Sequence, residues 1–102
     1  MRRGEIWWAD APEVGRRPYL VLTRDAAIPV VNAVLAVPAT RTVRGIPTEV
    51  PIGPHEGMPE ACALTLDNLT AMPKTFFVER ISELGPDLMA SVCRALARAA
   101  SC

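Results

Sequence analysis

The sequence predicts a mainly β fold, a small barrel of five to six short strands with one C-terminal α-helix. Ten prolines in 102 residues, about twice the usual share, separate short apolar runs and favour short strands over a helical bundle. A helical apolar period appears in one stretch, near the C-terminus. Half of the residues are hydrophobic and 22% are charged, which is the balance of a globular chain.

Three strands are predicted in the first half of the chain, at residues 5–9, 19–23 and 32–37. Trp7 and Trp8 are expected on opposite faces of the first strand, because side chains alternate along a strand. Pro38 cannot donate to a ladder and is expected to end the third strand. The segment between the first two strands, residues 10–16, is read as a short loop.

The second half carries weaker strand patterns. Residues 48–52 and 63–69 are predicted strands, separated by a loop rich in Gly and Pro at 53–60. Residues 73–77 fit either a helical turn or the end of the preceding strand, and residues 78–81 are ambiguous. These alternatives leave the strand count at five to six.

The terminal helix has a clear start and a clear buried face. Gly85 suits the N-cap, Pro86 the first helical position, and Asp87 the positive end of the helix dipole. The expected core residues recur at helical spacing. They are Leu88, Met89, Val92, Cys93 and Leu96. Arg94 and Arg98 are expected on the solvent side.

The charges are unevenly distributed although the net charge is zero. Residues 1–48 hold seven basic and four acidic residues, and the remainder holds four basic and seven acidic ones. A neutral chain is not one that coats nucleic acid by charge alone. However, every basic residue of the first part is Arg, which suits bidentate phosphate contacts.

The sequence lacks the residues that several kinds of binding and catalytic site require. The sequence has no phosphate-binding glycine loop, no HExxH pair and no GxSxG elbow, and its single His55 excludes a two-histidine ribonuclease mechanism. Cys62, Cys93 and Cys102 fit neither a disulfide framework nor a zinc site, so we expect reduced thiols in a cytoplasmic protein. No uncharged run is long enough to span a bilayer.

Five motifs occur in a fixed order along the chain. They are RGEIWW at residues 3–8, RPYLVLT at 17–23, VPAT at 37–40, LDNLT at 66–70, and the stretch from Lys74 to Leu84. Together with the terminal helix they cover residue 2 to about residue 97. Each motif alone is moderately specific, but the ordered set resembles the MazF/PemK family of toxins.

The resemblance implies an SH3-like (CcdB/PemK-type) barrel, with residues 1–102 forming a single toxin domain that works as a homodimer. It implies a metal-independent, cofactor-free endoribonuclease that cuts single-stranded RNA, foremost mRNA, at short sequences and so inhibits translation and growth. It also implies a cognate MazE-like antitoxin as partner, no membrane association and a cytoplasmic location.

Carried over by motif, the catalytic residues are Arg17 and Thr40. Metal-free RNA cleavage uses the 2′-hydroxyl as nucleophile, giving a 2′,3′-cyclic phosphate and a 5′-hydroxyl, so DNA is not expected to be cut. Arg17 is a fixed fork of donors for phosphate oxygens and a poor base, since an Arg pKa stays above about 12. Thr40 can donate a hydroxyl hydrogen bond to the same phosphate.

The residues expected to bind RNA around this pair are Arg16, Arg41, Trp8 and Thr23. Glu13 is the only nearby candidate for the carboxylate that some family members keep upstream of the Arg. The short 10–16 segment departs from the family, whose members usually carry a longer segment there that covers the RNA.

Two other functions fit a small β-barrel. One is a toxin that binds gyrase on the same fold without cutting RNA, and the other is a plain SH3-like interaction module, since fold alone does not fix function. The presence of both Arg17 and Thr40 favours the enzyme, because a gyrase-binding toxin has no need of that pair.

Overall fold

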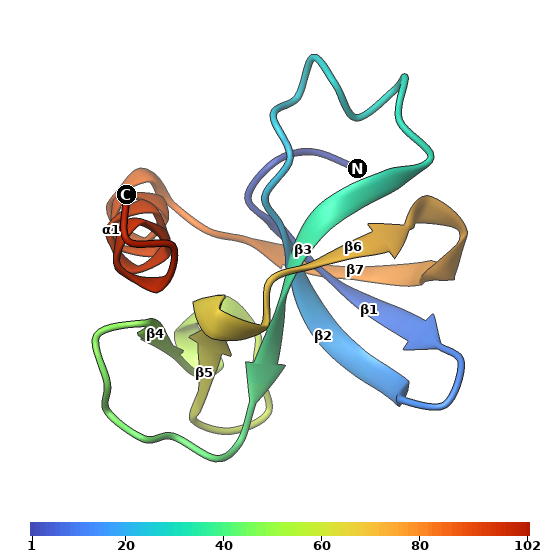
Figure 1. Cartoon of the computed structure of the whole chain (residues 1–102). Coiled ribbons are helices and arrows are strands. Elements are labelled where there is room, and N and C mark those ends of the chain that lie inside the picture. The colour runs from blue at the N-terminus through green and yellow to red at the C-terminus, as the bar shows by residue number, and fades with distance from the viewer.

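The computed structural model describes residues 1–102 and contains seven antiparallel strands, three short 3₁₀ turns and one α-helix (Figure 1). The strands are β1 Glu5–Ala11, β2 Gly15–Val21, β3 Ala33–Thr40, β4 Glu49–Ile52, β5 Cys62–Thr65, β6 Thr70–Pro73 and β7 Phe77–Glu83. The turns are η1 Pro54–Glu56, η2 Leu66–Asn68 and η3 Lys74–Phe76, and the helix is α1 Pro86–Ala99. The mainly β prediction with a C-terminal helix is confirmed, with seven strands rather than five or six.

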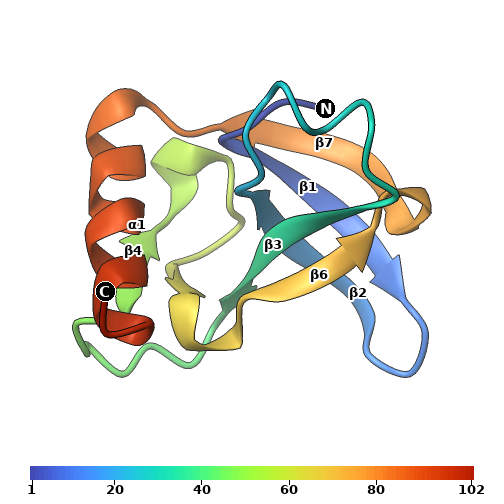
Figure 2. The ribbon, with the colours of Figure 1, turned by 45° about the horizontal axis from the view of Figure 1, so that its top comes forward.

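The sheet runs in the order β4-β5-β3-β2-β1-β7, and β6 pairs with β3 off this path. β3 therefore has three partners. Its middle pairs with β2, its first half with β6, and its last two residues, Ala39 and Thr40, with β5. Figure 2 shows β3 and β6 side by side, with β2 passing behind them. The prediction that Pro38 ends this strand is wrong, because β5 takes over the pairing just beyond it.

The β1–β2 hairpin is tighter than the sequence indicates. Its register pairs Ala11 with Gly15, so only residues 12–14 form the turn rather than the predicted loop 10–16. Glu13 and Gly15 have positive φ angles of 72° and 90°, which lets the chain reverse in three residues. As a result Arg17 lies inside β2, opposite Ala9, and not ahead of the strand.

The predicted strand 63–69 is two elements. β5 ends at Thr65, and the chain then makes the turn η2, where Leu66 is buried and the Thr48 hydroxyl donates to Asp67 at 2.6 Å. Asp and Asn favour such turns because their side chains compete for backbone groups. Of the two alternatives for residues 73–77, the helical turn is the one that forms, as η3, and the ambiguous 78–81 lies within β7.

The main core lies between the curved sheet and α1, which packs against β4 and η2 (Figures 1 and 2). Gly85 is the N-cap and Pro86 the first helical residue, as predicted. Val92 and Ala95 are buried, and Leu88, Met89 and Leu96 pack around them. No helix of the structure is both long and apolar enough to cross a membrane.

The prediction that Cys93 belongs to the core is wrong. Cys93 is exposed, and its Sγ lies 3.5 Å from Nη2 of Arg3. Each helical residue is turned by about 100° from the last. The step from Val92, which is completely buried, therefore carries Cys93 out of the apolar face.

Val92 gives a direct test of how α1 is held. We expect Val92→Ala to lower the free energy of unfolding by about 2 kcal/mol, because it removes two buried methyl groups and leaves a cavity. Urea unfolding curves measure the change. Val78→Ala, at a position 48% exposed, is the matched control and should stay within about 0.5 kcal/mol of the parent chain. Equal losses in the two variants would contradict this view of the core.

Candidate active site

A cleft of about 620 Å³ collects five of the six residues predicted to act on RNA. They are Trp8, Arg16, Arg17, Thr40 and Arg41. β1 supplies Trp8, β2 supplies both Arg16 and Arg17, and Thr40 is the last residue of β3. Residues distant in sequence meet here because β1, β2 and β3 are neighbours in the sheet.

The opposite wall of the cleft was missed by the sequence analysis. It consists of Met58, Pro59, Glu60 and Cys62, from the loop before β5 and the start of that strand. Burial raises the pKa of the Cys62 thiol, and the nearby carboxylates of Glu56 and Glu60 raise it further, so this thiol stays neutral. A loop rich in Gly and Pro carries no pattern that indicates which of its side chains face a site.

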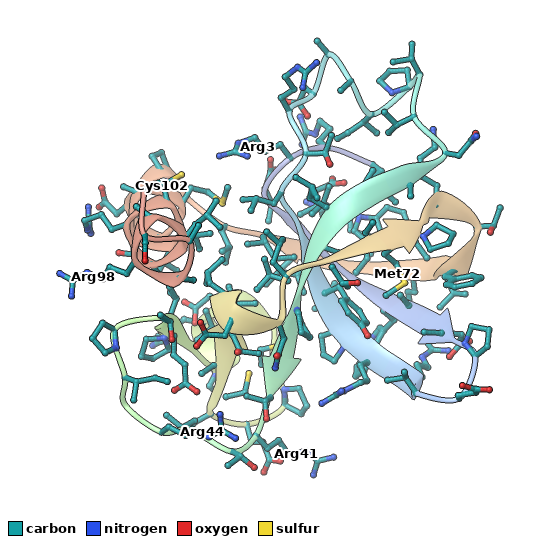
Figure 3. The ribbon with its side chains drawn as sticks, in the orientation of Figure 1. Arg3, Arg41, Arg44, Met72, Arg98 and Cys102 are labelled. Carbon is teal, nitrogen blue, oxygen red and sulfur yellow. The ribbon has the colours of Figure 1, made fainter.

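Arg17 and Thr40 also line a second hollow of about 250 Å³. Its other walls include Tyr19, Arg44 and Asn68. Thr42 lines both hollows as well. Arg17 and Thr40 therefore lie on a ridge between two depressions, where an extended chain could cross with one unit on each side. Figure 3 shows Arg41 and Arg44 projecting at the same end of the molecule, from the segment that follows β3.

The two ridge residues have free donors. Arg17 is exposed and takes part in none of the ion pairs or side-chain hydrogen bonds of the structure, so its guanidinium can bind an anion. The Thr40 Oγ1 accepts a hydrogen bond from the Thr42 N–H at 3.1 Å. That contact uses a lone pair and leaves the hydroxyl hydrogen available for donation.

The two flanking arginines are already paired. Arg16 Nη2 lies 3.3 Å from Glu79 Oε1, and the same guanidinium stands 5.4 Å from the centre of the Trp8 ring, within cation–π range. Arg41 Nη1 lies 3.1 Å from Glu60 Oε1. Arg17 is thus the one arginine lining this cleft without a carboxylate partner.

Three other residues considered in the sequence analysis lie outside the cleft. Thr23 is buried, and its Oγ1 accepts the Leu35 N–H at 2.7 Å. This bond extends the contact of β3 with the segment that follows β2. Glu13 is exposed at the hairpin turn, and His55 is exposed in η1; neither lines the two hollows. No group of three or more His, Cys, Asp or Glu side chains is placed to hold a metal ion.

Comparison with known proteins gives the same family as the ordered motifs. A family model described as a PemK-like, MazF-like toxin of type II toxin–antitoxin systems matches residues 2–100. The chain is 40% identical over 101 residues to the probable endoribonuclease MazF5 of Mycobacterium tuberculosis, covering 98% of this chain and 93% of that protein. It is also 40% identical over 103 residues to the probable endoribonuclease MazF2 of the same species, over the full length of both.

Solved structures give the same result in three dimensions. The M. tuberculosis toxin MazF-mt6 superposes with a TM-score of 0.89 at 29% identity, covering 95% of this chain and 96% of that one. A mycobacterial endoribonuclease in complex with its cognate antitoxin superposes with a TM-score of 0.88 at 28% identity, covering 99% of this chain and 95% of that one.

Proposed function

The chain belongs to the PemK-like, MazF-like family of type II toxin–antitoxin toxins and is a MazF-type endoribonuclease, and we propose that it cuts single-stranded RNA without a metal at the Arg17–Thr40 ridge. The observation that carries this proposal is the free guanidinium of Arg17 beside a Thr40 hydroxyl that can still donate. Both are donors, which suits the charge that develops on a phosphate during cleavage.

The proposed reaction is an internal phosphoryl transfer. The 2′-oxygen attacks the adjacent phosphorus, the P–O2′ bond forms, and the P–O5′ bond breaks. The 2′-hydroxyl loses its proton and the leaving O5′ gains one, giving a 2′,3′-cyclic phosphate and a 5′-hydroxyl. Arg17 binds the non-bridging oxygens, where its charge and planar fork offset the developing charge, and Thr40 donates a further hydrogen bond.

The surrounding residues position the strand. Trp8 offers an aromatic face for a base, and Arg16 and Arg41 offer contacts to flanking phosphates. Thr23 has no place in this proposal, since its hydroxyl is buried against the backbone of Leu35.

The partners follow from the family. One structural neighbour was solved with its cognate antitoxin, and we propose that this chain likewise forms a homodimer that a MazE-like antitoxin holds inactive. Released from it, the enzyme would cut mRNA in the cytoplasm and stop translation and growth.

The test uses purified protein, a long single-stranded RNA and EDTA, with the new 5′ ends mapped. We expect discrete cuts with 5′-hydroxyl ends, and no cuts in DNA of the same sequence, which lacks the 2′-hydroxyl. Thr40→Ala should slow cleavage about 100-fold, because one preorganised donor to the transition state is lost. Thr40→Ser should restore most of the rate.

Thr75→Ala is the control, because Thr75 is an exposed residue of η3 that lines neither hollow. Absence of cleavage by well-folded protein would overturn the proposal and favour a toxin that acts by binding alone. Cleavage that requires an added metal would overturn its metal-independent part.

A further inference from the structure

Each guanidinium that flanks Arg17 in the cleft is held by a carboxylate from a different element. Glu79 lies on β7, where it pairs with Trp8 of β1, and reaches Arg16. Glu60 lies on the opposite wall, just before β5, and reaches Arg41. The carboxylates therefore approach from two sides, and both leave Arg17 alone.

From this arrangement we infer that the carboxylates of Glu60 and Glu79 mask Arg41 and Arg16 in the free protein: they occupy the guanidinium groups that would otherwise bind phosphates. RNA then binds by exchanging these carboxylates for its own phosphates. The inference rests on the proposed function, because it takes the cleft as the RNA site, and it assigns to two acidic residues a role in selecting where the strand binds.

The pairs are weak enough to exchange. Side chains in them are 49% exposed for Arg16, 64% for Glu79, 84% for Arg41 and 57% for Glu60. Ion pairs this exposed contribute little to stability, because water and salt screen them. A phosphodiester carries the same charge as a carboxylate and fits the guanidinium fork equally well, so exchange at Arg16 or Arg41 gives little net binding.

Arg17 differs from Arg16 and Arg41 because its guanidinium has no carboxylate partner within the protein. A phosphate gains most where it meets this uncompensated cation, which favours the alignment that places the scissile phosphate on the ridge. A cleft with three open arginines would hold polyanions, DNA included, in many alignments. Masking two of the three arginines weakens the binding of polyanions in these other alignments, and so lowers the affinity for strands that cannot be cut.

Binding measurements test the masking. The probe is a single-stranded RNA with one 2′-deoxy nucleotide at a cleavage site mapped for the parent enzyme, which blocks the reaction. Glu60→Gln and Glu79→Gln should each lower its Kd about 2- to 5-fold at low salt. Each should also steepen the slope of log K against log salt concentration by up to about 0.7, because no displaced carboxylate then regains salt cations that offset the counterions released from the strand.

The matched control is Glu83→Gln. Glu83 also pairs with an arginine, Arg2 at 2.9 Å, and it lines neither hollow. Its loss should leave both Kd and salt slope unchanged. In an Arg41→Gln background, Glu60→Gln should no longer tighten binding, because the cation that it masks is absent.

The outcomes separate the two proposals. If the parent enzyme cuts RNA but Glu60→Gln and Glu79→Gln bind it no more tightly, the masking is wrong and the proposed function stands. A large loss of cleavage in Glu60→Gln at unchanged Kd would also overturn the masking, since it would show Glu60 acting in proton transfer. A parent enzyme that neither binds nor cuts RNA would overturn both.

Discussion

Arg17→Ala is expected to slow single-turnover RNA cleavage by about 10³-fold, while the Kd for RNA rises only several-fold. The guanidinium is the one charged donor in the cleft without a partner, so its loss removes charge stabilisation that is strongest in the transition state. Its effect should exceed that of Thr40→Ala, because hydrogen bonds from a charged group are about twice as strong as neutral ones. Rates measured with EDTA present at saturating enzyme isolate the chemical step.

Two further variants show whether charge or geometry matters at Arg17. Arg17→Lys keeps the charge but loses the planar fork, so an intermediate rate is expected. Arg24→Ala removes an exposed arginine from the loop after β2, outside both hollows, and should cut RNA at the parent rate. Because the Arg17 side chain is exposed and unpaired, Arg17→Ala should unfold like the parent chain. A rate within about threefold of the parent would remove Arg17 from the catalytic role.

The site could be predicted from sequence only where residues lie in motifs. The sequence motifs contain Arg17 and Thr40, and the structure brings these two residues into one cleft with Trp8, Arg16 and Arg41. The wall that carries Glu60 could not be named, because it reaches the cleft through the pairing of β5 with the end of β3. Such a contact between distant segments leaves no local pattern in a single sequence.

In the fold, too, features set by local sequence are predictable, and features set by contacts between distant segments are not. The helix start at Gly85 and Pro86 follows from local preferences and was predicted correctly. The end of β3 was not, because the rule that proline stops a strand ignores a second partner strand beyond Pro38. The helical period places Cys93 only roughly, because it is an apolar residue next to the core residue Val92. The packing of the helix on the sheet decides which side chains are buried, and it leaves Cys93 exposed.

Glu5 joins β1 to β7, the first and last strands along the chain, which are neighbours at one edge of the sheet. Glu5 is a buried residue, 5% exposed. Oε1 accepts the Arg2 N–H at 2.7 Å and the Trp7 Nε1–H at 3.0 Å, while Oε2 accepts the Arg80 Nε–H at 2.8 Å. Burial acts to raise the pKa of Glu5, but the hydrogen bonds from Trp7, Arg80 and Arg2 outweigh it and lower the pKa from 4.5 to about 2. The charged form is therefore the one that the fold stabilises.

A folded-state pKa below the unfolded value makes Glu5 stabilising above about pH 4.5, and this contribution is lost as the pH falls toward 2. The shift corresponds to about 3 kcal/mol at neutral pH.

We expect Glu5→Gln to lower the free energy of unfolding by about that amount at pH 7. The amide carries no charge, and its NH₂ group is a donor that would face other donors. Urea unfolding from pH 7 to pH 2 should show a flatter acid dependence than in the parent chain. Glu83→Gln, at a carboxylate 39% exposed beside the same Arg80, should cost less than about 1 kcal/mol. An unchanged acid dependence in Glu5→Gln would show that another carboxylate governs stability in acid, and that the contact between β1 and β7 depends on the strand pairing rather than on this buried charge.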